Sequence, residues 1–283
     1  MSHLGCSRAM LAALLLIGCE DPLKAAQVLE EPRILGVRLV AAGDQSSLEP
    51  GQDAELEVLL AGPEGMLSAR LAYQLCEAAE SERGVPYCAG TAFTEATVDL
   101  DGTPIPLAVP SEVEPGARLA VLGVACLDAE PELAPDPIDW SCSDGQAGLR
   151  FSFDARSSSP DVVNLNPDLS QVSLSISGVA VQPTTGRPAN CDGGNSIVAA
   201  DAMHQVSFEL GEGAREAGES LQLSHFSSRG HFERHYSFVA PEKQPEARLS
   251  WRAPHAGTTL QQYLVVRDGR GGVSWLSFSL CAD

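Results

Sequence analysis

The sequence predicts an all-β protein made of two β-sandwiches in tandem. Short runs of alternating apolar and polar residues recur at roughly even spacing, and Gly, Pro and Asp separate them. Helical periodicity is weak everywhere after residue 18. Short period-two runs with turn residues between them are typical of sandwiches. About 265 residues follow residue 18, which is enough for two modest hydrophobic cores.

The first series of expected strands lies within residues 32–156, the predicted first sandwich. The turn signals Glu49-Pro50-Gly51 and Glu114-Pro115-Gly116 each precede an apolar run. The expected strands are residues 34–40, 55–60, 70–75, 118–124 and 149–153.

Residues 157–170 are predicted to link the two sandwiches, because Ser157 to Asp161 are small and polar with one proline. Residues 171–283 form the predicted second sandwich. Its expected strands are residues 172–176, 206–210, 221–223, 232–239, 248–251, 263–266 and 273–278. Residues 77–83 and 211–219 are candidates for a turn of helix.

Residues 1–18 have the parts of a secretory signal. Arg8 forms a short basic start, Ala9 to Ile17 form an apolar core, and Gly18 is a small residue before a cleavage point. The apolar stretch is too short to span a bilayer, which takes about 20 residues.

The motif Leu16-Ile17-Gly18-Cys19 resembles the lipobox of bacterial lipoprotein precursors, and this resemblance covers the first 19 residues. It implies that the signal is removed, that the Cys19 thiol receives a diacylglyceryl group, and that the new amino terminus is acylated. Several acyl chains anchor a protein stably, whereas one chain binds a membrane only marginally. The alternative is an ordinary secreted protein with a chance cysteine at this position.

Residues 19–31 are expected to form a lipidated tether. Residues 20–31 reach only about 40 Å when fully extended, so we expect the first sandwich to stay close to the membrane. In the lipoprotein family, residues in the places of Glu20 and Asp21 influence sorting between membranes, and we expect the outer membrane.

The second sandwich resembles the immunoglobulin-like domains of bacterial surface proteins. The resemblance rests on Trp251-Arg252-Ala253-Pro254, Gly257 and the stretch from Tyr263 to Gly272. In such domains this last stretch is the penultimate strand and the turn into the last one. The first sandwich resembles them more loosely, through residues 32–40 and 50–60. The resemblance implies two tandem immunoglobulin-like β-sandwiches. The whole chain is similar in style to surface lipoproteins of myxobacteria-like Gram-negative bacteria.

Six cysteines remain once Cys6 is lost with the signal and Cys19 carries lipid. They are Cys76, Cys88, Cys126, Cys142, Cys191 and Cys281. An even count in an exported chain indicates disulfides, with 15 possible connectivities. No CxxC pair is present, which argues against a zinc or thioredoxin-like site.

The immunoglobulin topology that the resemblance implies narrows these pairings. Cys76 and Cys126 would end neighbouring antiparallel strands at opposite poles, which favours Cys76–Cys88 and Cys126–Cys142. First and last strands commonly run parallel in these sandwiches, which favours Cys191–Cys281.

The chain is strongly acidic, with 38 Asp and Glu against 18 Lys and Arg and a formal net charge of −20. Such a chain would be repelled by phosphates, so no nucleic-acid partner is expected. Solubility explains the charge; calcium or a basic partner is the alternative. Asn164, Asn166 and Asp168 are the best calcium candidates because they lie beside the linker, although no EF-hand spacing occurs and Asx-rich turns are ordinary hairpin chemistry.

Other candidate sites have simpler structural explanations. On a strand, His231 and His235 would lie about 13 Å apart, too far for one zinc ion, so a solvated strand face is expected; a weak metal or pH-responsive patch that includes His225 is the alternative. Arg267 to Gly272 is glycine-rich but lacks a phosphate-loop pattern, and we expect a hairpin turn. Trp140 is expected to pack over the end of a sandwich, or else to offer its ring to a partner.

No catalytic residue is expected, since the chain has no Gly-x-Ser-x-Gly elbow, no His-Glu-x-x-His motif and no spare thiol. The resemblances imply a non-enzymatic, cofactor-free envelope lipoprotein that serves adhesion, scaffolding or protein contact. Its expected partners are the bilayer and an envelope or extracellular protein, which would bind loops or an exposed strand edge. The alternative is a calcium- or carbohydrate-binding surface module of the same architecture.

Overall fold

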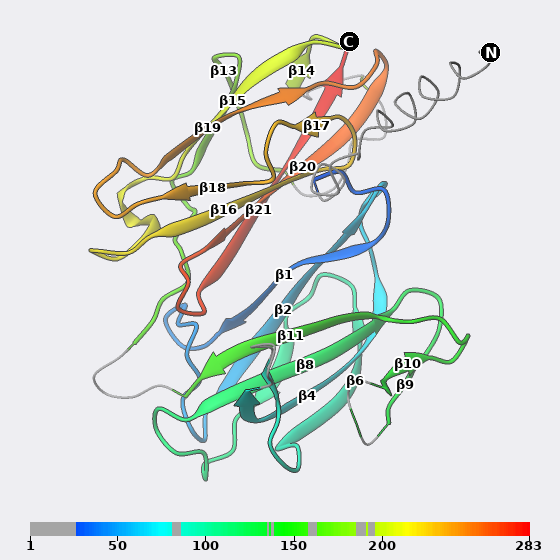
Figure 1. The fold of residues 1–283 in the computed structure, drawn as a ribbon, viewed down its shortest axis with the longest axis vertical. Helices are drawn as coiled ribbons and strands as arrows, with labels where there is room; N and C mark the ends of the chain where they lie inside the picture. Colours follow the sequence, from blue (N-terminus) through cyan, green and yellow to red (C-terminus); the bar gives the residue numbers. More distant parts are fainter. Residues whose placement is uncertain are drawn as a thin grey trace, which may run out of the picture.

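The computed structural model of the chain describes residues 27–80, 86–134, 136, 139–157, 163–184, 191 and 196–283. The expected signal peptide and Cys19 lie outside the described residues. The described chain is built almost wholly of β-strands in two stacked units (Figure 1). The prediction of an all-β fold with two tandem sandwiches is therefore confirmed.

The first sandwich has two antiparallel sheets. One sheet consists of β1 (Arg33–Val40), β2 (Asp53–Gly62), β3 (Gly65–Met66) and β7 (Ile105–Ala108). The other consists of β11 (Leu149–Arg156), β8 (Arg118–Cys126), β4 (Ala69–Glu80), β5 (Pro86–Cys88) and β6 (Thr94–Leu100). A small ribbon of β9 (Pro131–Glu132) and β10 (Ser141–Cys142) lies beside them. Alternate apolar residues of both sheets, such as Leu56, Leu71 and Val121, form the core between them.

The second sandwich also has two sheets. One consists of β13 (Val179–Val181), β12 (Ser173–Ile176), β15 (Met203–Glu209), β19 (Glu246–Arg252) and β17 (His231–Phe232). The other consists of β14 (Ser196–Val198), β21 (Val273–Ala282), β20 (Thr258–Arg267), β16 (Leu221–Ser227) and β18 (Tyr236–Val239). Strands β12, β15 and β19 in one sheet, with β16, β20 and β21 in the other, have the arrangement of an immunoglobulin fold. Trp251, Phe208 and Phe278 fill the core.

Both faces of the central strand β8 are buried. Alternation would leave one face polar, but Ala120, Leu122 and Val124 stand on the face away from the core. The Cys76–Cys88 bridge covers Leu122, and Trp140 with the Cys126–Cys142 bridge covers Val124. Trp140 is therefore only 2% exposed, and it packs over a sheet face rather than an end of the sandwich.

The structure contains the three expected disulfides, Cys76–Cys88, Cys126–Cys142 and Cys191–Cys281. The expected parallel pairing of the first and last strands, on which Cys191–Cys281 was predicted, is wrong. The strand parallel to β21 is β14, which follows Cys191, whereas the first strand β12 belongs to the opposite sheet.

The two candidates for a turn of helix differ in outcome. Residues 77–80 continue β4 as strand, so a helix there is wrong for the described residues. Residues 212–214 do form a short 3₁₀ turn.

The two sandwiches pack sheet against sheet. The outward faces of β1 and β2 contribute Leu35, Leu59 and Ala61, and the outward faces of β20 and β21 contribute Tyr263 and Val265. Arg38 lies over the Trp275 ring, with its guanidinium carbon 4.7 Å from the ring centroid. A Cβ at Gly36 would come within 3.1 Å of the same ring, so glycine permits this close approach.

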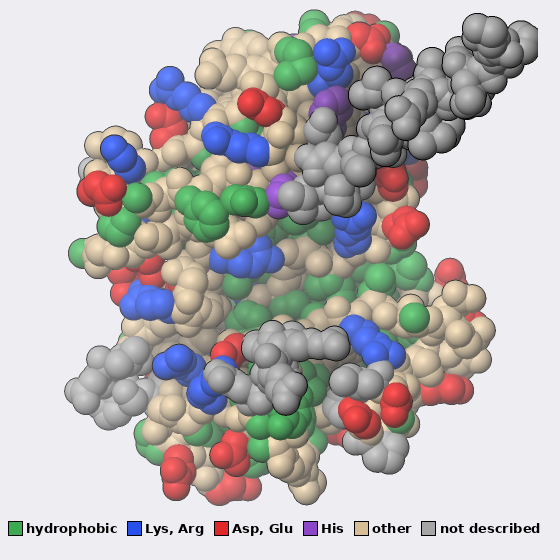
Figure 2. Space-filling model, viewed as in Figure 1, with side chains coloured by type: hydrophobic (Ala, Val, Ile, Leu, Met, Phe, Trp, Pro, Cys, Tyr) green, Lys and Arg blue, Asp and Glu red, His purple; other side chains and the backbone are tan. Residues whose placement is uncertain are grey.

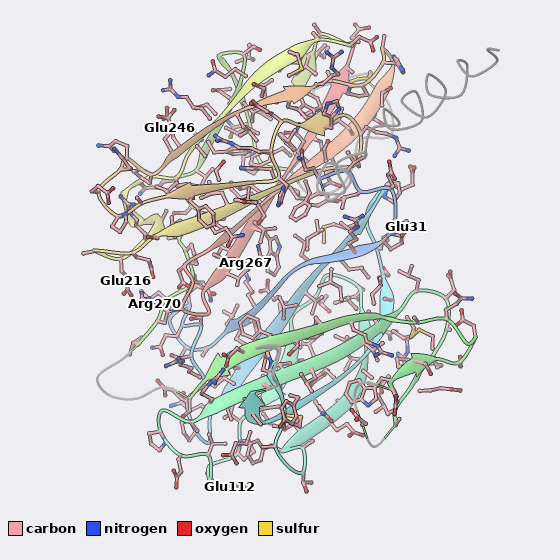
Figure 3. All side chains as sticks on the ribbon, in the orientation of Figure 1. Glu31, Glu112, Glu216, Glu246, Arg267 and Arg270 are labelled. Carbon is pink, nitrogen blue, oxygen red and sulfur yellow. A yellow bond between two sulfur atoms is a disulfide. The ribbon has the colours of Figure 1, made fainter. Side chains whose placement is uncertain are left out.

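A half-buried arginine also joins the two units. Arg267 of β20 points between them (Figure 3) and donates to the Leu35 carbonyl at 2.7 Å and to Ser224 Oγ at 3.2 Å. Burial lowers the pKa of Arg267 from its ordinary value.

Residues 27–29, expected to belong to the tether, are part of the folded body. Val28 forms a parallel bridge with Ser227 of β16, and the Leu29 amide donates to the Ser227 carbonyl at 2.9 Å. Leu29 is fully buried in the cluster between the sandwiches. The expectation of a tether is therefore wrong for residues 27–29, because Leu29 has an apolar interface to enter.

Candidate functional site

Two of the three calcium candidates serve the junction between the sandwiches. Asn164 and Asn166 are 6% and 4% exposed. Asn164 Nδ2 donates to Ser46 Oγ and to Asp268 Oδ2, each at 2.7 Å. Asn166 Nδ2 donates to the Leu39 carbonyl at 2.8 Å, and its Oδ1 accepts from the amide of Val273 at 3.0 Å. These amides therefore tie β1 and the following loop to the β20–β21 turn.

Asp168 does not join them. It is exposed, and its Oδ1 accepts from the Ser170 amide at 2.8 Å, which lowers the pKa of this carboxyl. Across the part of the chain that the structure describes, no three His, Cys, Asp or Glu side chains gather in a way that could hold a metal ion.

The three clustered histidines occupy different surroundings. His225 is fully buried and stacks on Phe208, with ring centroids 5.3 Å apart. His231 is exposed on β17, and His235 is half-buried against Tyr236. They do not form a common site.

A cavity of about 410 Å³ opens at the junction between the sandwiches. Ser47, Arg156 and Ser157 line it on the side of the first sandwich, and the β20–β21 turn lines it on the other side. That turn contributes Arg270, which already pairs with Glu216 and Glu219 at 2.7 Å each (Figure 3). None of the described residues lining the cavity is aromatic, so it lacks a stacking surface for a sugar ring.

The edge strand β18 is an accessible candidate contact site. It ends the sheet order β14-β21-β20-β16-β18, and within the described residues only β16 pairs with it. Among the described residues no strand pairs with its other edge, the free edge, and Figure 1 shows β18 beside β16. The Arg267–Gly272 segment, by contrast, forms the predicted hairpin turn between β20 and β21.

Hydrogen bonding fixes which backbone groups of β18 point outward. The His225 amide donates to the His235 carbonyl at 2.8 Å, in the same register that pairs Leu223 with Ser237. Antiparallel pairs alternate between bonded and non-bonded. Tyr236 and Phe238 therefore direct their N–H and C=O groups away from β16, toward the free edge.

The same two residues carry exposed rings. Tyr236 is 40% exposed and Phe238 is 68% exposed, the highest value for a large hydrophobic side chain among the described residues. Their ring centroids lie 5.2 Å apart in an edge-to-face arrangement. Ser237 and Val239, which alternate with them, face the core.

These rings lie on the face of the sheet that packs against the first sandwich. Tyr236 pairs with Ser224, Ser224 with Val265, and Val265 with Trp275. Directly paired residues share a face, and Val265 and Trp275 belong to the cluster between the sandwiches. The aromatic pair thus extends this apolar face to its uncovered edge.

Alternation along the sequence predicts one strand over residues 232–239, and this is why the site could not be foreseen. The chain instead changes sheets: β17 pairs with β19, and β18 pairs with β16. Phe232 enters the core at 2% exposure, whereas Phe238 stays in water. The alternation of Tyr236 and Phe238 with Ser237 and Val239 was the available signal, but it does not tell which set faces inward.

No protein-family model matches the chain, and no curated protein matches its sequence. Solved structures match it in part. The red sea bream transglutaminase matches at 10% identity and TM-score 0.25, over 88% of this chain and 31% of that one. The FN1–FN3 domains of chicken CNTN1 match at 7% identity and TM-score 0.23, over 88% and 64%. Latent PorU from Porphyromonas gingivalis matches at 11% identity and TM-score 0.27, over 89% and 24%. The chain thus spans less than two thirds of each, and these similarities concern the β fold alone.

In the part of the chain that the structure describes, no helix has the length and hydropathy that a membrane span requires.

Proposed function

We propose that this chain is a non-enzymatic lipoprotein of the bacterial envelope, anchored through lipid on Cys19 and placed at the outer membrane. Its joined sandwiches offer the free edge of β18 to a protein partner. The lipobox Leu16-Ile17-Gly18-Cys19 supports the anchor. The outward backbone groups and exposed rings of Tyr236 and Phe238 support the contact, and they are the observation that carries this proposal.

A strand edge with unpaired N–H and C=O groups is a template for an extended segment of another protein. The partner that fits β18 is such a segment, with apolar side chains on the face of the two rings. Backbone hydrogen bonds would supply affinity, and the rings would supply buried area at low cost in side-chain entropy.

The anchor is tested on the protein isolated from its native membrane. Mass spectrometry should find residues 1–18 removed and lipid attached to Cys19. The variant Cys19→Ala should leave the membrane fraction. An unmodified Cys19 in the native protein would contradict the anchor.

The contact is tested with a photo-crosslinking phenylalanine analogue placed at Phe238 in intact cells. We expect a discrete adduct with one envelope protein. The matched control carries the analogue at Tyr87 of the first sandwich, which is 48% exposed, and should give no such adduct. Equal labelling from both positions would contradict a specific contact.

The variant Phe238→Pro separates backbone pairing from folding. Proline removes the N–H of residue 238, which in the original chain points to the free edge. Pairing with β16 is therefore kept. With the analogue moved to Tyr236, the adduct should fall about tenfold, equivalent to about 1.4 kcal/mol. Thermal stability should stay close to that of Phe238→Ala. An undiminished adduct would show that the edge is not used.

A further inference from the structure

We infer that the second sandwich, although later in the sequence, faces the lipid bilayer, and that the acidic first sandwich is held away from it. The bilayer-facing surface is the end of the second sandwich that carries β14 and the carboxyl terminus. This inference rests on the proposed anchor at Cys19, and it reverses the expectation that the first sandwich lies closest to the membrane.

The described chain begins at Gln27, which lies close to Cys19 in the sequence. Gln27 follows Cys19 by eight positions, so the intervening chain spans at most about 26 Å. Gln27 is only 2% exposed, and its carbonyl accepts from the Ser227 amide at 2.9 Å. An anchor at Cys19 therefore holds Ser227 of the second sandwich within reach of the bilayer surface.

The β14 end of the second sandwich lies close to this point. Ser227 pairs with Gln262, which lies four residues, or about 13 Å, from Thr258 at the start of β20. The Gly257 amide donates to the Ala282 carbonyl, and the Asp283 amide to the Val198 carbonyl. The carboxyl terminus, β14 and the β19–β20 turn thus form one end, at the top of Figure 1, with the first sandwich at the other end of the long axis.

This end exposes three large apolar side chains of the described residues. Val179, Ile197 and Met203 are 62%, 60% and 53% exposed. Ser177 Oγ lies 3.1 Å from His204 Nδ1, and His204 Nε2 lies 2.8 Å from the Ala199 carbonyl, which ties the β12–β13 hairpin to the β14–β15 loop. Such side chains gain free energy when they enter the headgroup boundary of a membrane.

Charge supports the same orientation independently. Residues 32–156 hold 21 Asp and Glu against 7 Lys and Arg, whereas residues 171–283 hold 11 against 9. In Figure 2 the basic side chains of this face lie mainly on the upper unit, whereas acidic side chains appear on both units. A surface of anionic lipid repels the first sandwich far more strongly than the nearly neutral second one.

The test uses the full-length lipidated protein bound to vesicles of phosphatidylethanolamine and phosphatidylglycerol that carry a headgroup nitroxide quencher. A fluorophore is attached at Ile197→Cys or, as the control, at Glu112→Cys. Glu112 is exposed at the far end of the first sandwich (Figure 3). We expect a large loss of fluorescence from position 197 and none from position 112. A second site, Met203→Cys, should behave like position 197.

Equal quenching at both positions, quenching only at position 112, or quenching at neither position would overturn the orientation. Flotation and mass spectrometry of the same samples report the anchor separately. A protein that lacks lipid and fails to float contradicts the proposed function, whereas a floating, lipidated protein with the wrong quenching pattern contradicts only the orientation.

Discussion

His225 is an ionisable residue placed where only an apolar one would be expected. Its ring stacks on Phe208 and lies 5.7 Å from Phe232, and Nε2 lies 3.1 Å from Ser237 Oγ. Burial, with smaller contributions from Arg234 and His235, lowers the pKa of His225 from 6.5 to about 3. The neutral ring is therefore part of the core of the second sandwich.

This depressed pKa predicts a pH-dependent stability. The unfolded chain binds a proton near pH 6.5, and the folded one does so only near pH 3, so the unfolded state is favoured as pH falls between them. The free energy of unfolding should be fully present above pH 6.5 and should fall by up to about 1.4 kcal/mol per pH unit down to pH 3. Urea unfolding at pH 7 and pH 4.5 measures it.

The variant His225→Leu should reduce this slope between pH 6.5 and 4.5. His231→Leu, at an exposed position on β17, should keep the slope of the original chain. If both variants show the same slope, His225 is not its source.

At the scale of elements, the disulfides cover or fasten individual strands of the sheets. The Cys76–Cys88 and Cys126–Cys142 bridges close short loops over the apolar outer face of β8. The Cys191–Cys281 bridge joins residues 90 positions apart and fastens the last strand, whereas Cys76–Cys88 spans only 12. In the chain-entropy model, a longer closed loop restricts the unfolded chain more.

The double variant with Cys191→Ser and Cys281→Ser should therefore lose more stability than the one with Cys76→Ser and Cys88→Ser. We expect losses of about 4.5 and about 3 kcal/mol respectively, measured by urea unfolding. A larger loss for the short loop would mean that its covering of β8 outweighs loop entropy.

For the whole molecule, the decisive feature is the contact between the sandwiches. Leu59 is 1% exposed there, although its side chain lies on the outward face of β2, and Leu56 and Leu60 on the same strand fill the core of the first sandwich. A charge at position 59 would be buried in the joined molecule but hydrated in a separated first sandwich. The contact can therefore be broken without unfolding either unit.

The variant Leu59→Glu should split one calorimetric unfolding transition into two and raise the radius of gyration in small-angle scattering, because a buried unpaired carboxylate costs several kcal/mol. Met66→Glu, at a 44% exposed position in the same sheet, is the matched control and should change neither. A single unchanged transition for Leu59→Glu would show that the units do not depend on this contact.

Local alternation was enough to predict most strands and the hairpin at Arg267 to Gly272. The immunoglobulin topology that the resemblance implies added Cys76–Cys88 and Cys126–Cys142, whereas Cys191–Cys281 was paired correctly from a wrong premise about the first strand. These features depend on neighbours along the chain and on strand direction. The sequence misassigned residues 232–239 and residues 27–29, and it gave no sign that Asn164 and Asn166 bond across the junction.

The residues it misassigned share a physical cause. Alternation shows that a strand has two faces, but which face meets water depends on a segment far away in the chain. Leu29 is buried because β16 and the opposite sandwich meet there, and Phe238 is exposed because no strand among the described residues continues the sheet beyond β18. The sequence alone determined that this chain forms strands in two units. Only the tertiary structure decided which of their faces and edges remained open, because burial is a property of the packed molecule.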